Sequence, residues 1–314
     1  MARGHFAKSE TQAASVMKEL QGQLTPYERQ QKALQEKINA GKIESVGTVR
    51  NYEQSLKICA DYLKEHKQGG LWSLTPDQAK TYLEIRASEC SQSTINMDRQ
   101  AIQAMMQHVT HQLDPKESLT IVKSELETIE KSRSYTPEQV NRIIERQTER
   151  HAISTEICQK AGLRAHELFT LRPSGEVQPS PREIHPDKFS HMPKQTKCYT
   201  VTGKGGLIRE VQLPSQLAER LESRKLDTPL HITDRGINYT THYNIAAGHK
   251  FSDAFSKASN RDLGYSNGAH GLRHSYAQDR YEQLANHLPR ESVLLCVSQE
   301  LGHFRPEITE VYLR

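Results

Sequence analysis

Hydrophobic positions recur at helical spacing through the N-terminal half of the chain. In one stretch the apolar residues lie three or four positions apart: Tyr52, Leu56, Cys59 and Leu63. In a later stretch they repeat every three, four or seven positions: Ile95, Ile102, Met105 and Val109. This periodicity predicts helices over about residues 48–65 and 93–108, each with one buried stripe.

Three expected helix starts share one capping pattern. Threonine at the N-cap is followed by proline at N1 and by Glu or Gln at N3, as in Thr25-Pro26-Tyr27-Glu28, Thr75-Pro76-Asp77-Gln78 and Thr136-Pro137-Glu138-Gln139. The hydroxyl and the N3 side chain satisfy exposed backbone N–H groups, and proline has none to lose. Each cap contributes on the order of 1 kcal/mol. Helices are therefore predicted to follow each threonine.

These elements indicate three segments. Residues 1–42 hold one or two helices and form either an N-terminal arm or part of the next domain. Residues 43–130 form a small helical domain, and a stretch without periodicity near residues 130–135 links it to a second domain over residues 131–314. In that domain, β-rich residues 198–202 and 207–213 flank a glycine turn and predict a hairpin. The rest is expected to be mostly helical, with an exposed proline-rich loop over residues 173–193.

Composition narrows the classes of protein only slightly. The chain of 314 residues suits about two domains, and its net charge of +4 permits a polyanionic partner without demanding one. Its five cysteines are scattered without CxxC spacing, which argues against a disulfide framework or a zinc site. No stretch reaches the ~20 apolar residues of a membrane span. A cytoplasmic protein without membrane contact is expected.

The chemically informative residues are polar and lie far apart in the chain. They are Arg164, Lys204, His270, Arg273, His303 and Tyr312. Arginines can neutralise the oxygens of a phosphodiester in its transition state, and a tyrosine can attack its phosphorus. A free tyrosine is only on the order of 0.1% phenolate at pH 7, so it needs cations or a base nearby. Histidines can supply either, and a lysine in a mobile turn can protonate the leaving oxygen.

Each motif alone has a simpler explanation. An HxxR run is close to noise, and Gly203-Lys204-Gly205-Gly206 is most often an exposed turn that lacks the end of a P-loop. Arg164 alone could pair with Glu167. His231, His242 and His249 lack metal-ligand spacing, and no clustered carboxylates suggest two-metal chemistry. Only the ordered combination indicates catalysis.

That combination resembles the tyrosine recombinase family, which includes lambda-type phage integrases and their Xer-like and Cre-like relatives. The first arginine motif of the family is similar to Gly162-Leu163-Arg164-Ala165-His166-Glu167-Leu168, and its hairpin lysine to Lys204. Its His-x-Leu-Arg-His box is similar to residues 270–274, including His274. Its Leu-Gly-His, followed nine residues later by tyrosine, is similar to Leu301, Gly302, His303 and Tyr312.

The resemblance implies a mainly α fold with a small antiparallel β-sheet: a helical, SAM-like core-binding domain and a mixed α+β catalytic domain. It implies that Tyr312 attacks the scissile phosphate, giving a 3′-phosphotyrosyl link and a free 5′-hydroxyl, without ATP, metal or other cofactor. Double-stranded DNA is the expected partner, held by a homotetramer on two synapsed sites near the nucleoid. An integrase of a mobile element, aided by an excisionase or a DNA-bending protein, is the main expectation.

Two features depart from the family. Residues 173–193 are longer and more irregular than the usual connection, and the sequence stops at Arg314, where relatives continue into a helix that packs on a neighbouring protomer. Either the chain is shortened or its subunits make contact differently. Two other functions remain open. One is a type IB topoisomerase-like or telomere-resolving enzyme, and the other a DNA-binding regulator that has lost cleavage.

Overall fold

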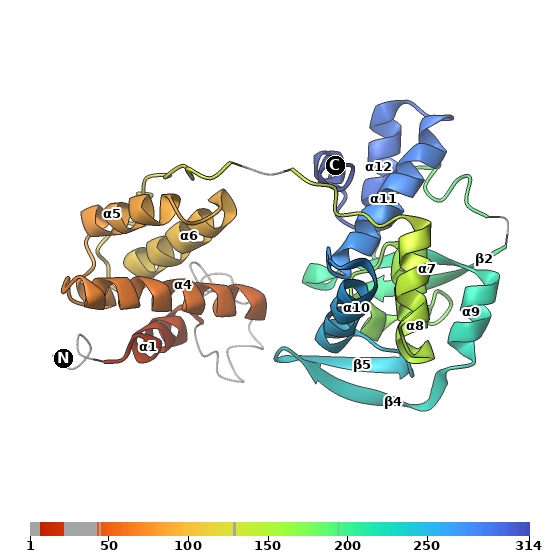
Figure 1. The fold of residues 1–314 in the computed structure, drawn as a ribbon, viewed down its shortest axis with the longest axis horizontal. Coiled ribbons are helices and arrows are strands. Elements are labelled where there is room, and N and C mark those ends of the chain that lie inside the picture. Colours follow the sequence, from red (N-terminus) through yellow and green to blue (C-terminus); the bar gives the residue numbers. More distant parts are fainter. Residues whose placement is uncertain (1–6, 22–42, 44, 128–129, 194) are drawn as a thin grey trace. The chain divides into compact units, whose positions relative to one another are not determined.

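The computed structural model describes residues 7–21, 43, 45–127, 130–193 and 195–314. The chain divides into two compact units, over residues 1–129 and 130–314 (Figure 1). Each unit has a hydrophobic core of its own. In the described ranges, no helix is both long and apolar enough to cross a membrane.

The first unit is a helical bundle. Its described helices are α1 (Ser9–Gln21), α4 (Val46–Glu65), α5 (Pro76–Ala87) and α6 (Gln92–His108), with a 3₁₀ turn η1 (Leu71–Ser73). The helices predicted over residues 48–65 and 93–108 are thus confirmed. Leu56, Cys59 and Leu63 of α4 are buried as predicted, and α1 adds Val16 and Leu20 to the same core.

Two of the predicted caps are present. The Thr75 hydroxyl accepts a hydrogen bond from the Gln78 backbone N–H at 3.3 Å, and the Gln78 side chain accepts one from the Thr75 N–H at 3.0 Å. Thr136 and Gln139 make the same pair of bonds at the start of α7 (Pro137–Glu145). The cap expected at Thr25 lies outside the described residues.

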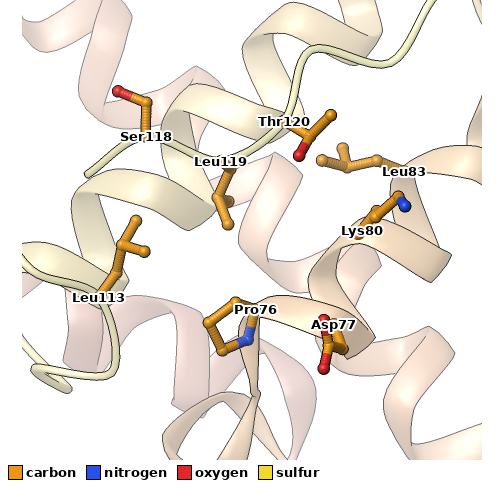
Figure 2. Close-up of a pocket in the computed structure, with 8 residues that line it drawn as sticks. All are labelled: Pro76, Asp77, Lys80, Leu83, Leu113, Ser118, Leu119 and Thr120. Carbon is orange, nitrogen blue, oxygen red and sulfur yellow. The ribbon is translucent and has the colours of Figure 1, made fainter.

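The segment after α6 folds back over the start of α5. Leu113 and Leu119 are buried there, and the segment and the helix enclose a small pocket (Figure 2). Its lining consists of Pro76, Asp77, Lys80, Leu83, Leu113, Ser118, Leu119 and Thr120. The volume is about 110 Å³, well below the roughly 300–1,000 Å³ of typical ligand pockets. This hollow is a packing feature, and it contains none of the predicted site residues.

The second unit combines helices with two small antiparallel sheets. Strands β1 (Arg172–Pro173), β2 (Thr196–Thr202) and β3 (Ile208–Pro214) form one sheet in that order, and β4 (Lys225–Asp234) pairs with β5 (Ile237–Tyr243). Its main helices are α7, α8 (Glu149–Ala161), α9 (Ser215–Glu222), α10 (Gly248–Leu263), α11 (His270–Ala285) and α12 (Arg290–Leu301). The predicted hairpin is β2–β3, and the mainly α fold with a small antiparallel sheet is confirmed.

Two details of this unit differ from the sequence prediction. Residues 225–243, included in a mostly helical remainder, form a hairpin instead, on which Leu230 and Ile237 are exposed. Residues 173–193 are irregular as predicted, but they are not a wholly exposed loop. Lys188 and Phe189 are half-buried because this part of the segment packs beside α12.

Helix α8 is central to the second unit and positions the candidate site. It packs against α7, α9, α10, α11 and β3, so that residues on most of its sides are buried. It ends at Gly162, whose backbone is left-handed (φ 60°) and turns the chain toward Arg164. A smaller core cluster joins α11 and α12 to the ring of Tyr312 in the 3₁₀ turn η4 (Glu310–Tyr312).

Candidate active site

The phenol of Tyr312 lies against the guanidinium of Arg273. Tyr312 is 7% exposed, and Arg273, in the first turn of α11, is fully buried. The Arg273 Nε donates a hydrogen bond of 3.4 Å to the Tyr312 hydroxyl, and its guanidinium carbon lies 5.5 Å from the centre of the tyrosine ring. The two residues are thus brought together within one chain.

Three histidines surround the same phenol ring. The ring centres of His270 and His274, both on α11, lie 5.7 and 4.7 Å from that of Tyr312. His303 follows the left-handed cap Gly302 at the end of α12, and its ring stacks on Tyr312 at 5.7 Å with an angle of 9° between planes. Both ring nitrogens of His303 are buried and lack a hydrogen-bond partner in the described part of the chain.

Arg164 joins the cluster through the buried carboxylate of Glu167. The Glu167 side chain accepts hydrogen bonds from the Arg164 backbone N–H at 2.8 Å and from the Arg164 Nη1 at 2.9 Å. It also lies 4.0 Å from Nη1 of Arg273. The two arginines predicted to hold a phosphate therefore share one anchoring carboxylate.

Arg273 is fixed further by two backbone carbonyls. Its Nη1 donates to the carbonyl of Gly162, and its Nη2 donates to that of Leu301. These carbonyls end α8 and α12, the helices that deliver Arg164 and His303. One guanidinium therefore holds three segments of the site in register.

Arg209 on β3 belongs to the same network, although it was not among the predicted site residues. This arginine is buried, donates to Glu167 Oε2 at 2.8 Å and donates to the carbonyl of Glu300 at 2.7 Å. A signal was present, because Arg209 alternates with the apolar Val211 and Leu213 and all three are buried. A cation on the inward face of a strand requires a buried partner.

Burial and the arginines set the charges of the cluster. Burial alone would raise the pKa of Glu167, but Arg209, Arg273 and Arg164 lower it to about 2. Burial and the neighbouring Arg164 lower the pKa of Arg273 to about 10, so it stays charged at pH 7. Burial and then Arg273 lower the pKa of His270 to about 4 and that of His303 to about 3. Burial and then Arg133 lower the pKa of His274 to about 4.

At neutral pH the cluster therefore carries a surplus of positive charge. In the described residues, Arg164, Arg209 and Arg273 face the single carboxylate Glu167, while the three histidines are neutral. Such an arrangement favours an anion beside Tyr312. Neutral imidazoles can also accept a proton, as a base must.

The sixth predicted residue lies on the β2–β3 hairpin. The backbone of Lys204 is in the 3₁₀ turn η3 (Lys204–Gly206), which the Gly203 N–H closes by donating to the Leu207 carbonyl at 2.7 Å. Its side chain is outside the described part of the structure. The five other predicted residues are brought together, and the catalytic assignment of all six stays a prediction.

Comparisons with known proteins agree with this architecture. Residues 33–112 match the family model of the phage integrase N-terminal SAM-like domain. A XerH site-specific recombinase bound to a palindromic difH substrate is 16% identical, with a TM-score of 0.56 over 98% of this chain and 89% of that chain. No curated protein matches significantly by sequence.

Two further solved structures are similar. The Tn1549 transposon integrase in complex with transposon right end DNA has a TM-score of 0.52 and 14% identity, over 90% of this chain and 93% of that one. A lambda integrase tetramer bound to a Holliday junction has a TM-score of 0.53 and 13% identity, and the match covers 89% of this chain and 75% of that chain. The predicted resemblance to the tyrosine recombinases is thus confirmed in the fold and in the N-terminal domain model.

Proposed function

We propose that this chain, which has the fold of the tyrosine recombinases, is a site-specific DNA recombinase that cuts and rejoins strands through a 3′-phosphotyrosyl intermediate. The observation that carries the proposal is the contact between the Tyr312 hydroxyl and Arg273 inside a buried, net-cationic cluster. A nucleophile and a cation that can bind an oxyanion are adjacent there. Phosphoryl transfer to a protein side chain requires both.

In the proposed reaction, the Tyr312 oxygen attacks the scissile phosphorus while the bond to the 5′-oxygen breaks. Arg164 and Arg273 bind the non-bridging oxygens, and each such preorganised donor is typically worth about 10²–10³ in rate. The phenol proton passes to a neutral imidazole, for which His303 has two unpartnered ring nitrogens. Lys204 protonates the departing 5′-oxygen. A 5′-hydroxyl of a partner strand then reverses these steps, so the bond energy is conserved and no cofactor is consumed.

The solved relatives support the proposed partner and assembly. XerH and the Tn1549 integrase are described in complexes with their DNA, and lambda integrase as a tetramer on a Holliday junction. For this chain we infer double-stranded DNA as the substrate and a homotetramer on two synapsed sites. Integration or excision of a mobile element, with an excisionase or a DNA-bending protein as helper, is the biological role that best fits these relatives.

The test is covalent capture on a nicked suicide duplex, whose sequence is first selected from a random library by binding to the full chain. Wild-type protein should form an adduct that resists denaturation. Tyr312→Phe should bind the duplex and form none. The matched control is Tyr265→Phe, which removes the hydroxyl of an exposed tyrosine and should react like wild type. An adduct with Tyr312→Phe would refute the assignment, and binding without any wild-type adduct would favour a non-cleaving regulator.

A further inference from the structure

The irregular segment between β1 and β2 is held against β3. The backbone N–H of Ser180 donates to the carbonyl of Ile208 at 2.9 Å, and the N–H of Ile208 donates to the Ser180 hydroxyl at 3.1 Å. Ile208 directly precedes Arg209, which belongs to the buried network of the candidate site. The segment is therefore anchored next to that network.

A second set of bonds holds the segment to α12. The backbone N–H of His185 donates to Gln299 Oε1 at 2.9 Å, and that of Phe189 donates to Glu300 Oε1 at 3.0 Å. Arg280, which pairs with Glu300 at 2.8 Å, also donates to the carbonyl of Ser190 at 3.0 Å. Residues 180–190, the docked segment, are thus fixed at both ends.

Between these anchors the docked segment presents Arg182. This residue is exposed, and its guanidinium carbon lies 5.1 Å from the centre of the Phe304 ring. Phe304 directly follows His303, whose ring stacks on Tyr312. A guanidinium placed over an aromatic face keeps its N–H donors free at the edge of the plane. The docked segment therefore carries an oriented cation beside the candidate site.

Arg182 also lacks a counter-ion among the described residues. Some exposed or half-exposed arginines of this unit have a carboxylate within 4 Å, as Arg172 has Glu176 and Arg290 has Glu310. Arg182 is among those without one, and it differs from them in its place over the Phe304 ring. The neighbour Glu183 is exposed and forms no ion pair with Arg182. An oriented arginine without a carboxylate suits an external anion with paired oxygens, such as a phosphate.

We infer that Arg182 binds a non-scissile phosphate of the DNA backbone next to the phosphate attacked by Tyr312. This inference rests on the proposed function, because it takes DNA as the ligand. The docked segment and Phe304 hold the guanidinium in place, so that the contact forms without ordering a free loop. Like other phosphate contacts, it contributes affinity and register rather than sequence preference.

The experiment compares Arg182→Ala with Arg220→Ala in the full chain, using the selected duplex as the probe. Arg220 is the matched control because its charge is already paired with Glu149 and Glu156 at 2.9 and 2.7 Å. Each phosphate contact adds about 0.9 to the slope of log affinity against log salt. Between about 50 and 200 mM salt, wild type and Arg220→Ala should lose about 3- to 4-fold more affinity than Arg182→Ala.

A methylphosphonate scan locates the contact. Replacing single phosphates near the nick by neutral methylphosphonates should weaken wild-type binding at several positions. At one of these positions the replacement should leave the affinity of Arg182→Ala unchanged. Arg182→Lys should retain the wild-type salt slope, which separates lost charge from altered folding. An unchanged slope for Arg182→Ala, with no position losing its effect, would overturn this inference alone if the wild type still captures DNA covalently. Failure of the wild type to bind any duplex would overturn the proposed function as well.

Discussion

The substitution Glu167→Gln tests the electrostatic construction of the site. Glu167 is fully buried and is the carboxylate shared by Arg164, Arg209 and Arg273. Glutamine keeps the size of the side chain and removes its charge. Three guanidiniums then face one another without an anion, so the folded state should lose stability.

The expected loss follows from the pKa of Glu167. Its lowering from 4.5 to about 2 corresponds to about 3 kcal/mol, at about 1.4 kcal/mol for each pKa unit. Removing one partner of a buried ion pair costs a similar amount, about 3–5 kcal/mol. For a domain of this size, about 3 kcal/mol lowers Tm by about 6–12 °C.

The assay is thermal unfolding of the full chain at pH 7. Glu156→Gln is the matched control, because Glu156 also pairs with an arginine, Arg220, but their side chains are 25% and 42% exposed. Such a pair is worth at most about 1 kcal/mol, so the control should change Tm by no more than about 4 °C. An equal drop in Tm for Glu167→Gln and Glu156→Gln would refute the claim that the buried carboxylate holds the three arginines together.

Wild type and Glu167→Gln can also be compared as a function of pH, and the direction of the change in their stability difference can be predicted. A carboxylate whose pKa is lowered by folding stabilises the protein above its unfolded pKa and loses that contribution as the pH falls through its folded pKa. The stability gap between wild type and Glu167→Gln should therefore be constant above pH 4.5 and narrow as the pH falls toward about 2. A gap that widens in acid would contradict the assignment of charge to Glu167.

Three further predictions concern the catalytic parts of the second unit. Gly302→Ala places a Cβ at φ +80° against Arg209, 2.8 Å from its Nε, so it should cost about 2–4 kcal/mol and slow cleavage. Gly264→Ala, at φ +77° with nothing within 4 Å, should cost only about 1 kcal/mol in a parallel unfolding assay. Lys204→Ala should slow adduct formation, and a substrate with a better 5′ leaving group should restore part of the rate. The absence of rescue would argue against its role as general acid. Adding EDTA should leave adduct formation unchanged, and a loss of activity that Mg²⁺ restores would contradict the metal-independent mechanism.

Local patterns in the sequence were sufficient for most of the fold. The helical stripes, the two described Thr-Pro caps and the glycine turn of β2–β3 depend on neighbours a few residues apart, and all appear in the structure. The hairpin β4–β5 was missed although a local signal was present. Apolar and polar residues alternate on both sides of Gly236, from Leu230 to Ile232 and from Ile237 to Tyr239.

Long-range polar contacts were harder to predict. The docked segment depends on bonds from His185 and Phe189 to side chains more than 100 residues later, at Gln299 and Glu300. No local signal predicts such pairs. The burial of Arg209 was easier to predict from the sequence, since this residue alternates with the buried apolar residues of β3 and so faces inward.

The most direct test of the central claim is to identify the residue that carries DNA after cleavage. The covalent adduct trapped on the suicide duplex is digested with protease and nuclease, and the modified peptide is sequenced by mass spectrometry. The expected result is a nucleotide linked through its 3′-phosphate to Tyr312, the phenol that contacts Arg273. A nucleotide linked to any other side chain would contradict it.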